Sequence, residues 1–99
     1  MQRGEVYQYL PVLPRPGQSR ARLIIRPRRQ RRGPPVVLGL QVLDRDPGGL
    51  LSIGIGELGW ASVLTIEAVL RGRLGDRLYR ATQEEMDAVS IALRAAQDL

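Results

Sequence analysis

Proline and glycine divide this chain into short segments, which limits the length of any regular element before its last fifth. The 99 residues include 11 glycines and 7 prolines. Because proline has no N–H to donate to a sheet ladder, a strand must end or run along an edge where proline occurs. Short strands at this spacing are typical of a compact barrel or a strongly curved sheet. We therefore expect one mainly β domain that spans residues 1–99.

Apolar and β-branched residues between these breaks predict the strands. The run at 36–43 is almost continuously apolar, which predicts a strand buried on both faces. The run at 62–70 fits a strand or a helix on pattern alone, and its valine and isoleucine content favours a strand. The other strands are expected at 4–10, 20–26, 50–55 and 75–81.

The end of the chain carries a clear helix signal. Thr82-Gln-Glu-Glu85 has the pattern of a capping box, in which the threonine hydroxyl and the glutamate carboxylate satisfy backbone amides of the first turn. Apolar residues then recur at helical spacing and form one stripe. These residues are Met86, Val89, Leu93 and Ala96. We expect a helix from about residue 83 to residue 97.

The composition excludes several kinds of chemistry. The chain has no cysteine and no histidine. Disulfides, thiolate metal sites, cysteine nucleophiles, Ser-His-Asp triads and histidine-based ribonucleases are therefore excluded. Any acid–base chemistry must use Glu, Asp, Arg, Tyr or backbone groups. Asp44 and Asp46 have metal-like spacing, but the Pro-Gly-Gly after them indicates a turn, so no metal site is expected.

Positive charge is concentrated at the start of the chain and is carried by arginine alone. Residues 1–33 hold nine arginines and one acid, within a net charge of +5. A guanidinium matches phosphate geometry with two parallel hydrogen bonds, so this pattern favours a polyanionic partner. No apolar run is long enough to span a bilayer and the first residues do not resemble a signal peptide, so a cytoplasmic protein is expected.

Three segments together resemble the MazF/PemK (Kid) family of toxin endoribonucleases. The first is Arg-Gly-Glu-Val-Tyr at 3–7, and the second is Arg-Ala-Arg-Leu-Ile-Ile at 20–25. The third combines Ser-Val at 62–63, Glu-Ala-Val at 67–69 and Arg-Leu at 73–74 with the closing helix pattern. The resemblance follows nearly the whole chain in order.

The resemblance implies a fold and a function. The fold would be a small SH3-like barrel of five to seven strands with a C-terminal α-helix, usually a homodimer. The activity would be metal-independent and cofactor-free cleavage of single-stranded RNA, as in an mRNA interferase that inhibits growth. The 2′-hydroxyl would attack its own phosphate and leave a cyclic phosphate. The partner would be a MazE-like antitoxin protein that blocks the RNA groove.

The resemblance also names candidate site residues. Arg20 would stabilise the phosphate in the transition state, and Glu67 would accept the 2′-hydroxyl proton. Their alternatives are a surface ion pair and an outward-facing strand residue. The candidate RNA-binding residues are Glu5, Arg22, Arg28, Arg29, Arg31, Arg32, Gln41, Thr65 and Trp60.

Several of these candidates have a second interpretation from the residues themselves. Glu5 could order Arg20 in an ion pair instead of contacting RNA. The arginine loop at 28–32 could be a solvated charge run. Trp60 could stack on a base or anchor the core, and Tyr7 and Tyr9 could do either as well.

Three positions depart from the family pattern. The residue after Arg20 is Ala21 where the family has proline, Gln41 falls near the family's Thr or Ser, and Ala68 replaces a glutamine. These changes favour an alternative in which an impaired barrel binds nucleic acid or an antitoxin without cutting RNA. A third possibility is a protein-interaction module whose basic loop meets an acidic partner.

Overall fold

The structure is a computed structural model that describes residues 1–13, 15–16, 18–27 and 35–98. Within these ranges, seven strands form one sheet in the order β4-β5-β3-β2-β1-β7, with β6 also paired to β3, and all of these pairings are antiparallel. The elements are β1 (Glu5–Tyr9), β2 (Ala21–Pro27), β3 (Val36–Leu43), β4 (Ser52–Ile55), β5 (Gly59–Ser62), the 3-10 turn η1 (Val63–Thr65), β6 (Glu67–Leu70), the 3-10 turn η2 (Arg71–Arg73), β7 (Leu74–Arg80) and α1 (Gln83–Gln97). The mainly β fold with a C-terminal helix is thus confirmed.

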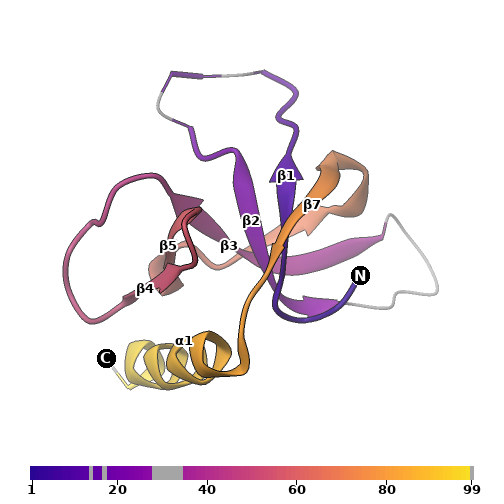
Figure 1. Ribbon diagram of the computed structural model, residues 1–99. Helices are drawn as coiled ribbons and strands as arrows, with labels where there is room; N and C mark the ends of the chain where they lie inside the picture. The colour runs from indigo at the N-terminus through magenta and orange to yellow at the C-terminus, as the bar shows by residue number, and fades with distance from the viewer. Residues whose placement is uncertain (14, 17, 28–34, 99) are drawn as a thin grey trace.

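The long strand β3 organises the sheet (Figure 1). One edge of β3 pairs with β2. The other edge pairs with β6 through Val36–Gly39 and with β5 through Val42 and Leu43. One strand therefore holds three neighbours, and two different segments of the chain follow each other along its far edge.

The strand expected at 62–70 is only partly confirmed, because the chain turns in the middle of this run. Gly59–Ser62 forms β5, Val63–Thr65 forms a 3-10 turn, and only Glu67–Leu70 continues as a strand. The hydroxyl of Thr65 donates a hydrogen bond to the carbonyl oxygen of Ser62 at 2.7 Å. Such local hydrogen bonds from side chains compete with the backbone hydrogen bonds of a sheet. Here the turn separates β5, which pairs with the end of β3, from β6, which pairs with its beginning.

Apolar residues fill both faces of the central strands, as the pattern of 36–43 predicts. The main core lies between the sheet and α1 and includes Leu23, Leu40 and Val89. A smaller cluster of Ile24, Val37 and Val69 forms on the opposite face. Since side chains alternate along a strand, β2 sends Leu23 to the helix side and Ile24 to the other side. We call this second side the outer face.

The helix α1 is confirmed at Gln83–Gln97, and its capping box is present. The Glu85 carboxylate accepts hydrogen bonds from the backbone of Thr82, the backbone of Gly56 and the Tyr79 hydroxyl. Burial acts to raise the pKa of Glu85, but these hydrogen bonds outweigh it and lower that pKa. Glu85 therefore joins the start of α1 to the sheet. In the described part of the chain, no helix is long and apolar enough to cross a membrane.

One glycine fits a position that no other residue could occupy. Gly59, the first residue of β5, has a φ of +145°. A Cβ atom there would collide with the carbonyl oxygen of Leu43 on β3. The turn between β4 and β5 can therefore approach β3 only without a side chain.

We expect Gly59→Ala to lower the free energy of unfolding by more than about 2 kcal/mol, because it adds both a collision and backbone strain. Thermal unfolding should show a midpoint lower by about 10 °C or more. Gly72→Ala is the matched control, since a Cβ there meets nothing within 4 Å. Equal melting temperatures for the two variants would contradict this account of β5.

Candidate functional site

A row of polar side chains crosses the outer face of the sheet. In the strand register, Arg77 of β7 lies opposite Tyr7 of β1. Tyr7 lies opposite Arg22 of β2, and Arg22 lies opposite Gln41 of β3. Residues paired in this way project to the same face of a sheet. Four strands therefore bring these side chains side by side, although they are far apart in the sequence.

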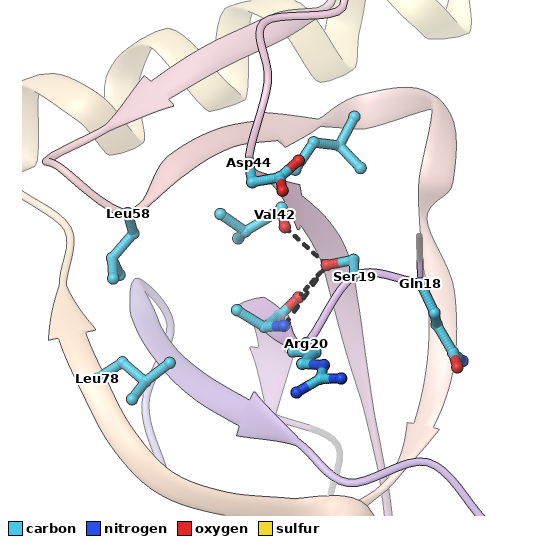
Figure 2. Close-up of a pocket in the computed structure, with 9 residues that line it drawn as sticks. Gln18, Ser19, Arg20, Val42, Asp44, Leu58 and Leu78 are labelled. Atoms are coloured by element: carbon cyan, nitrogen blue, oxygen red, sulfur yellow. Dashed lines mark hydrogen bonds between the residues drawn. The ribbon is translucent and has the colours of Figure 1, made fainter. Parts of the chain in front are cut away.

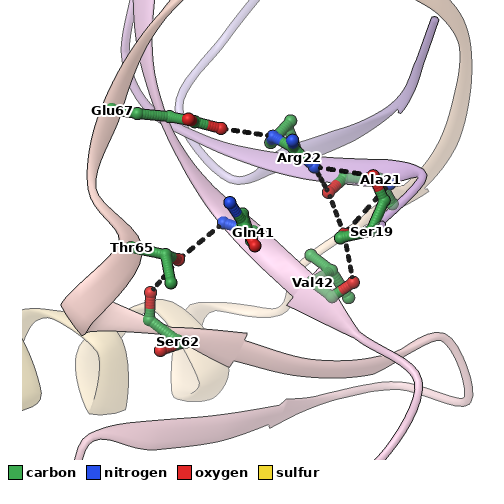
Figure 3. A network of polar contacts seen from close by, with 8 residues as sticks. All are labelled: Ser19, Ala21, Arg22, Gln41, Val42, Ser62, Thr65 and Glu67. Carbon is green, nitrogen blue, oxygen red and sulfur yellow. Dashed lines mark hydrogen bonds and ion pairs between the residues drawn. The ribbon is translucent and has the colours of Figure 1, made fainter. Parts of the chain in front are cut away.

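Arg22 is the buried centre of this row (Figure 3). Its side chain is 2% exposed, and its Nε donates a hydrogen bond to Oε1 of Glu67 at 2.6 Å. Its Nη1 donates to the carbonyl oxygens of Ser19 and Ala21. The guanidinium also lies over the ring of Tyr9, 3.9 Å from its centroid. A buried charge needs such partners, and here a carboxylate, two carbonyls and an aromatic face supply them.

Glu67 lines a hollow that we call the Glu67 pocket. The pocket has a volume of about 270 Å³. Tyr9 and Arg73 line it as well, so it contains an acid, a cation and an aromatic ring. The side chain of Glu67 is 38% exposed while that of its partner Arg22 is buried. The buried guanidinium of Arg22 thus fixes the Glu67 carboxylate, and the rest of that carboxylate is accessible from the pocket.

Thr65 and Gln41, both predicted to bind RNA, lie next to each other. The Thr65 hydroxyl accepts a hydrogen bond from the backbone N–H of Gln41 at 3.0 Å. The same hydroxyl donates to Ser62. The hydrogen atom of the Thr65 hydroxyl is therefore already engaged in an intramolecular hydrogen bond. The two hydrogen bonds of this hydroxyl fix the turn that places β6 beside β3.

A second polar group, the Glu5 cluster, surrounds the hydroxyl of Tyr7. Glu5 is 5% exposed, and its carboxylate accepts hydrogen bonds from Arg77 Nη1 at 2.8 Å and from the Tyr7 hydroxyl at 3.0 Å. The expected ion pair of Glu5 therefore forms, but with Arg77 instead of Arg20. The positive charge of Arg71 acts weakly on the Tyr7 hydroxyl, so we count Arg71 with this cluster.

The Glu5 cluster shifts two pKa values in opposite directions. The hydrogen bond from Arg77 outweighs burial and lowers the pKa of Glu5 from its ordinary value of 4.5 to about 2. Burial and the hydrogen bond to Glu5 raise the pKa of the Tyr7 hydroxyl. Near neutral pH, Glu5 is therefore an anion and Tyr7 is a neutral donor.

Arg20, the predicted catalytic arginine, lines the pocket shown in Figure 2, and Glu67 lines another. This Arg20 pocket has a volume of about 470 Å³, and Ser19, Asp44 and Leu58 contribute to its lining. The Ser19 hydroxyl donates to the carbonyl oxygen of Val42 at 2.6 Å. Arg20 is exposed and lies immediately before β2. The fold thus brings Arg22 to Glu67, and it does not bring Arg20 into the Glu67 pocket.

The remaining candidates lie elsewhere. Trp60 is half-buried and lines a third hollow with Asp44 and Glu57, and it belongs to neither core cluster. Among the described residues, no three acidic side chains gather in a group that could hold a metal ion. The loop arginines Arg28, Arg29, Arg31 and Arg32 lie outside the described residues.

Arg73 and Arg77 are candidate site residues that the sequence did not predict. Arg73 could have been found, since it follows the Glu67 segment within a few residues and belongs to the family resemblance. Arg77 carried no comparable signal. Its partner Glu5 is 72 residues away, so only the pairing of β1 with β7 brings the two together.

The fold matches those of two mycobacterial endoribonucleases. One is an endoribonuclease in complex with its cognate antitoxin, with 22% sequence identity and a TM-score of 0.76 over 98% of this chain and 94% of that chain. The other is an endoribonuclease with 22% identity and a TM-score of 0.75 over 98% of this chain and 90% of that chain. No protein-family model matches the chain, and no curated protein matches it by sequence. At this identity the likeness establishes a common fold.

The lowered pKa of Glu5 predicts a specific dependence of stability on pH. A carboxylate with a lowered pKa stabilises the fold above its ordinary pKa, and this contribution is lost as the pH falls toward about 2. Urea unfolding should therefore show the parent more stable than Glu5→Gln at about pH 6, with the difference shrinking steadily below about pH 4.5. Glu57→Gln removes an exposed carboxylate and should follow the parent throughout. A constant gap between the parent and Glu5→Gln from pH 6 to 2 would contradict this assignment.

Proposed function

We propose that this protein is a toxin-type endoribonuclease that cleaves single-stranded RNA without a metal ion. The observation that carries the proposal is the Glu67 pocket, where an exposed carboxylate, held by a buried guanidinium, shares a hollow with Arg73. The common fold with two mycobacterial endoribonucleases supports it. The MazF/PemK resemblance of the motifs supports it independently.

Glu67 is the general base in this proposal. Its carboxylate accepts the proton of a ribose 2′-hydroxyl, and the 2′-oxygen then attacks the adjacent phosphorus. The bond from phosphorus to the 5′-oxygen breaks, and the departing oxygen takes a proton from water. The hydroxide left behind takes the proton back from Glu67, which restores the carboxylate. The products are a 2′,3′-cyclic phosphate and a free 5′-hydroxyl. No oxidant, metal or cofactor is needed for this step.

The two neighbouring arginines have different tasks. Arg22 is a positioning residue, because it is buried and its Nε and Nη1 already donate to Glu67 and to two backbone carbonyls. Arg73 lines the same pocket as Glu67 and supplies positive charge where the phosphate gains negative charge. This assignment gives Arg73 the role that the resemblance gave to Arg20.

The partner and the assembly belong to the same proposal. One of the two structural neighbours is in complex with its cognate antitoxin, and we propose an antitoxin protein as partner here. We also propose a cytoplasmic homodimer, since a domain of this size buries a limited share of its surface alone.

A noncatalytic RNA-binding protein is the second candidate. The hydrogen bonds of Thr65 favour it, because this hydroxyl is engaged with the backbone of Gln41 and Ser62. The buried state of Arg22 favours it too, since this guanidinium cannot reach a phosphate. In that case the same outer face would hold RNA without cutting it.

Cleavage of a labelled single-stranded RNA pool in EDTA tests the proposal. We expect Glu67→Gln to lower the cleavage rate by about 10²–10⁴-fold while its amide oxygen still accepts the bond from Arg22. Arg73→Gln should lower the rate by about 10²–10³-fold, as for loss of a transition-state contact. Arg20→Gln, which removes the same charge from the other pocket, should change the rate less than about threefold.

Two outcomes would redirect the assignment. Loss of cleavage in Arg20→Gln with normal cleavage in Arg73→Gln would move the active site to the Arg20 pocket. Salt-sensitive binding of RNA by the parent protein, with no cleavage product on a gel, would establish the noncatalytic candidate.

A further inference from the structure

We infer that the Glu5 cluster is a second phosphate-binding site, with Arg77 as the contact and Glu5 as its positioning residue. RNA bound at the Glu67 pocket would then continue along β1, past Tyr9 and Tyr7, to Arg77. This inference rests on the proposed function, because it extends the path of the same substrate.

The first argument is placement. Arg77 projects from the same face of the sheet as Arg22, with Tyr7 between them. Two strand spacings of about 4.8 Å put the two backbones about 10 Å apart. Arg22 in turn contacts Glu67 and Tyr9, which line the Glu67 pocket. Arg77 therefore lies too far along the face to serve the phosphate beside Glu67, and it can serve another phosphate of the same strand.

The second argument is that Arg77 is both fixed and accessible. Its Nη1 donates to the buried carboxylate of Glu5, yet its side chain is 57% exposed. Among the hydrogen bonds of the described residues, Nη1 is the only nitrogen of this side chain with a partner. A guanidinium held at one corner loses little freedom when its remaining nitrogens form a fork with phosphate.

The third argument concerns charge and aromatic surface. Glu5 compensates one positive charge, but Arg71 adds another, which weakly opposes the rise in the pKa of the Tyr7 hydroxyl that burial and Glu5 cause. The cluster of Glu5, Arg71 and Arg77 therefore has a net positive charge. The half-buried rings of Tyr7 and Tyr9 lie along the path to the Glu67 pocket. Positive groups beside aromatic rings are the usual means of holding a single strand without sequence preference.

Binding of uncleavable RNA tests this inference separately from cleavage. Fluorescence anisotropy would measure the dissociation constants of mixed-sequence oligonucleotides, 2′-O-methylated throughout, in lengths from about three to about ten nucleotides. The methyl groups remove the attacking hydroxyl, so a failure of Glu67 as a base has no effect on this readout. The parent protein should gain affinity at the length at which the strand reaches Arg77.

We expect Arg77→Gln to lose this gain, with about fivefold to tenfold weaker binding of the longest oligonucleotide and little change for the shortest. The slope of log affinity against log salt should fall by about 0.7, the value for one phosphate contact on a single strand. Arg77→Lys should keep part of the gain, because it retains the charge without the fork. Arg94→Gln, an exposed arginine on α1, should keep the full gain.

Three results would overturn the inference. One is an Arg77→Gln variant that retains the gain in affinity with length. Another is an equal loss in Arg77→Gln and Arg94→Gln, which would indicate diffuse attraction between charges. The third is a parent protein whose affinity does not rise with length, which would leave Arg77 as one half of a structural ion pair.

Discussion

Burial of the Arg22 guanidinium is the constraint on which the outer face of this protein depends. A charge that is 2% exposed is tolerated only when its donors are satisfied and a counter-charge lies close. Glu67 provides the counter-charge from β6, and the carbonyls of Ser19 before β2 and of Ala21 at its start accept from Nη1. The requirement therefore ties β2 to β6, which are not paired in the sheet but both lie beside β3.

Because Arg22 is buried, the two members of its ion pair have different roles. Arg22 stabilises the sheet from inside, and its partner Glu67 is left partly open at the Glu67 pocket. At the other end of the outer face, Glu5 is the buried member and Arg77 the exposed one. In each ion pair the buried residue fixes the exposed one. The exposed charge is negative in the Arg22–Glu67 pair and positive in the Glu5–Arg77 pair.

Local patterns predicted most of the elements, because they depend on neighbouring residues. The helix follows from its capping box and apolar stripe, and β3 follows from its apolar run. The run at 62–70 was predicted only in part, since its turn depends on a hydrogen bond from the Thr65 hydroxyl to Ser62 and on one from the backbone N–H of Gln41 to that hydroxyl. The long-range bond to β3 has no signature in a local pattern.

The candidate site could be predicted only in part, and the reason lies in the spacing of two arginines, one immediately before β2 and one on it. Arg20 and Arg22 are two residues apart, so alternation alone cannot tell which one meets Glu67. The turn at Thr65 sets the position of β6, and this position places Glu67 next to Arg22. The position of Arg77 is harder to predict from the sequence, because a register shift between β1 and β7 places it opposite Tyr7.

The most direct measurement of the central claim is an NMR titration of the ¹⁵N-labelled protein with uncleavable single-stranded RNA. If the outer face with the Arg22–Glu67 pair receives RNA, the largest amide shifts will fall on Tyr9, Glu67 and Arg73 and will extend along β1. Shifts confined to Ser19, Asp44 and the rest of the Arg20 pocket would contradict the account, because RNA would then occupy that pocket instead.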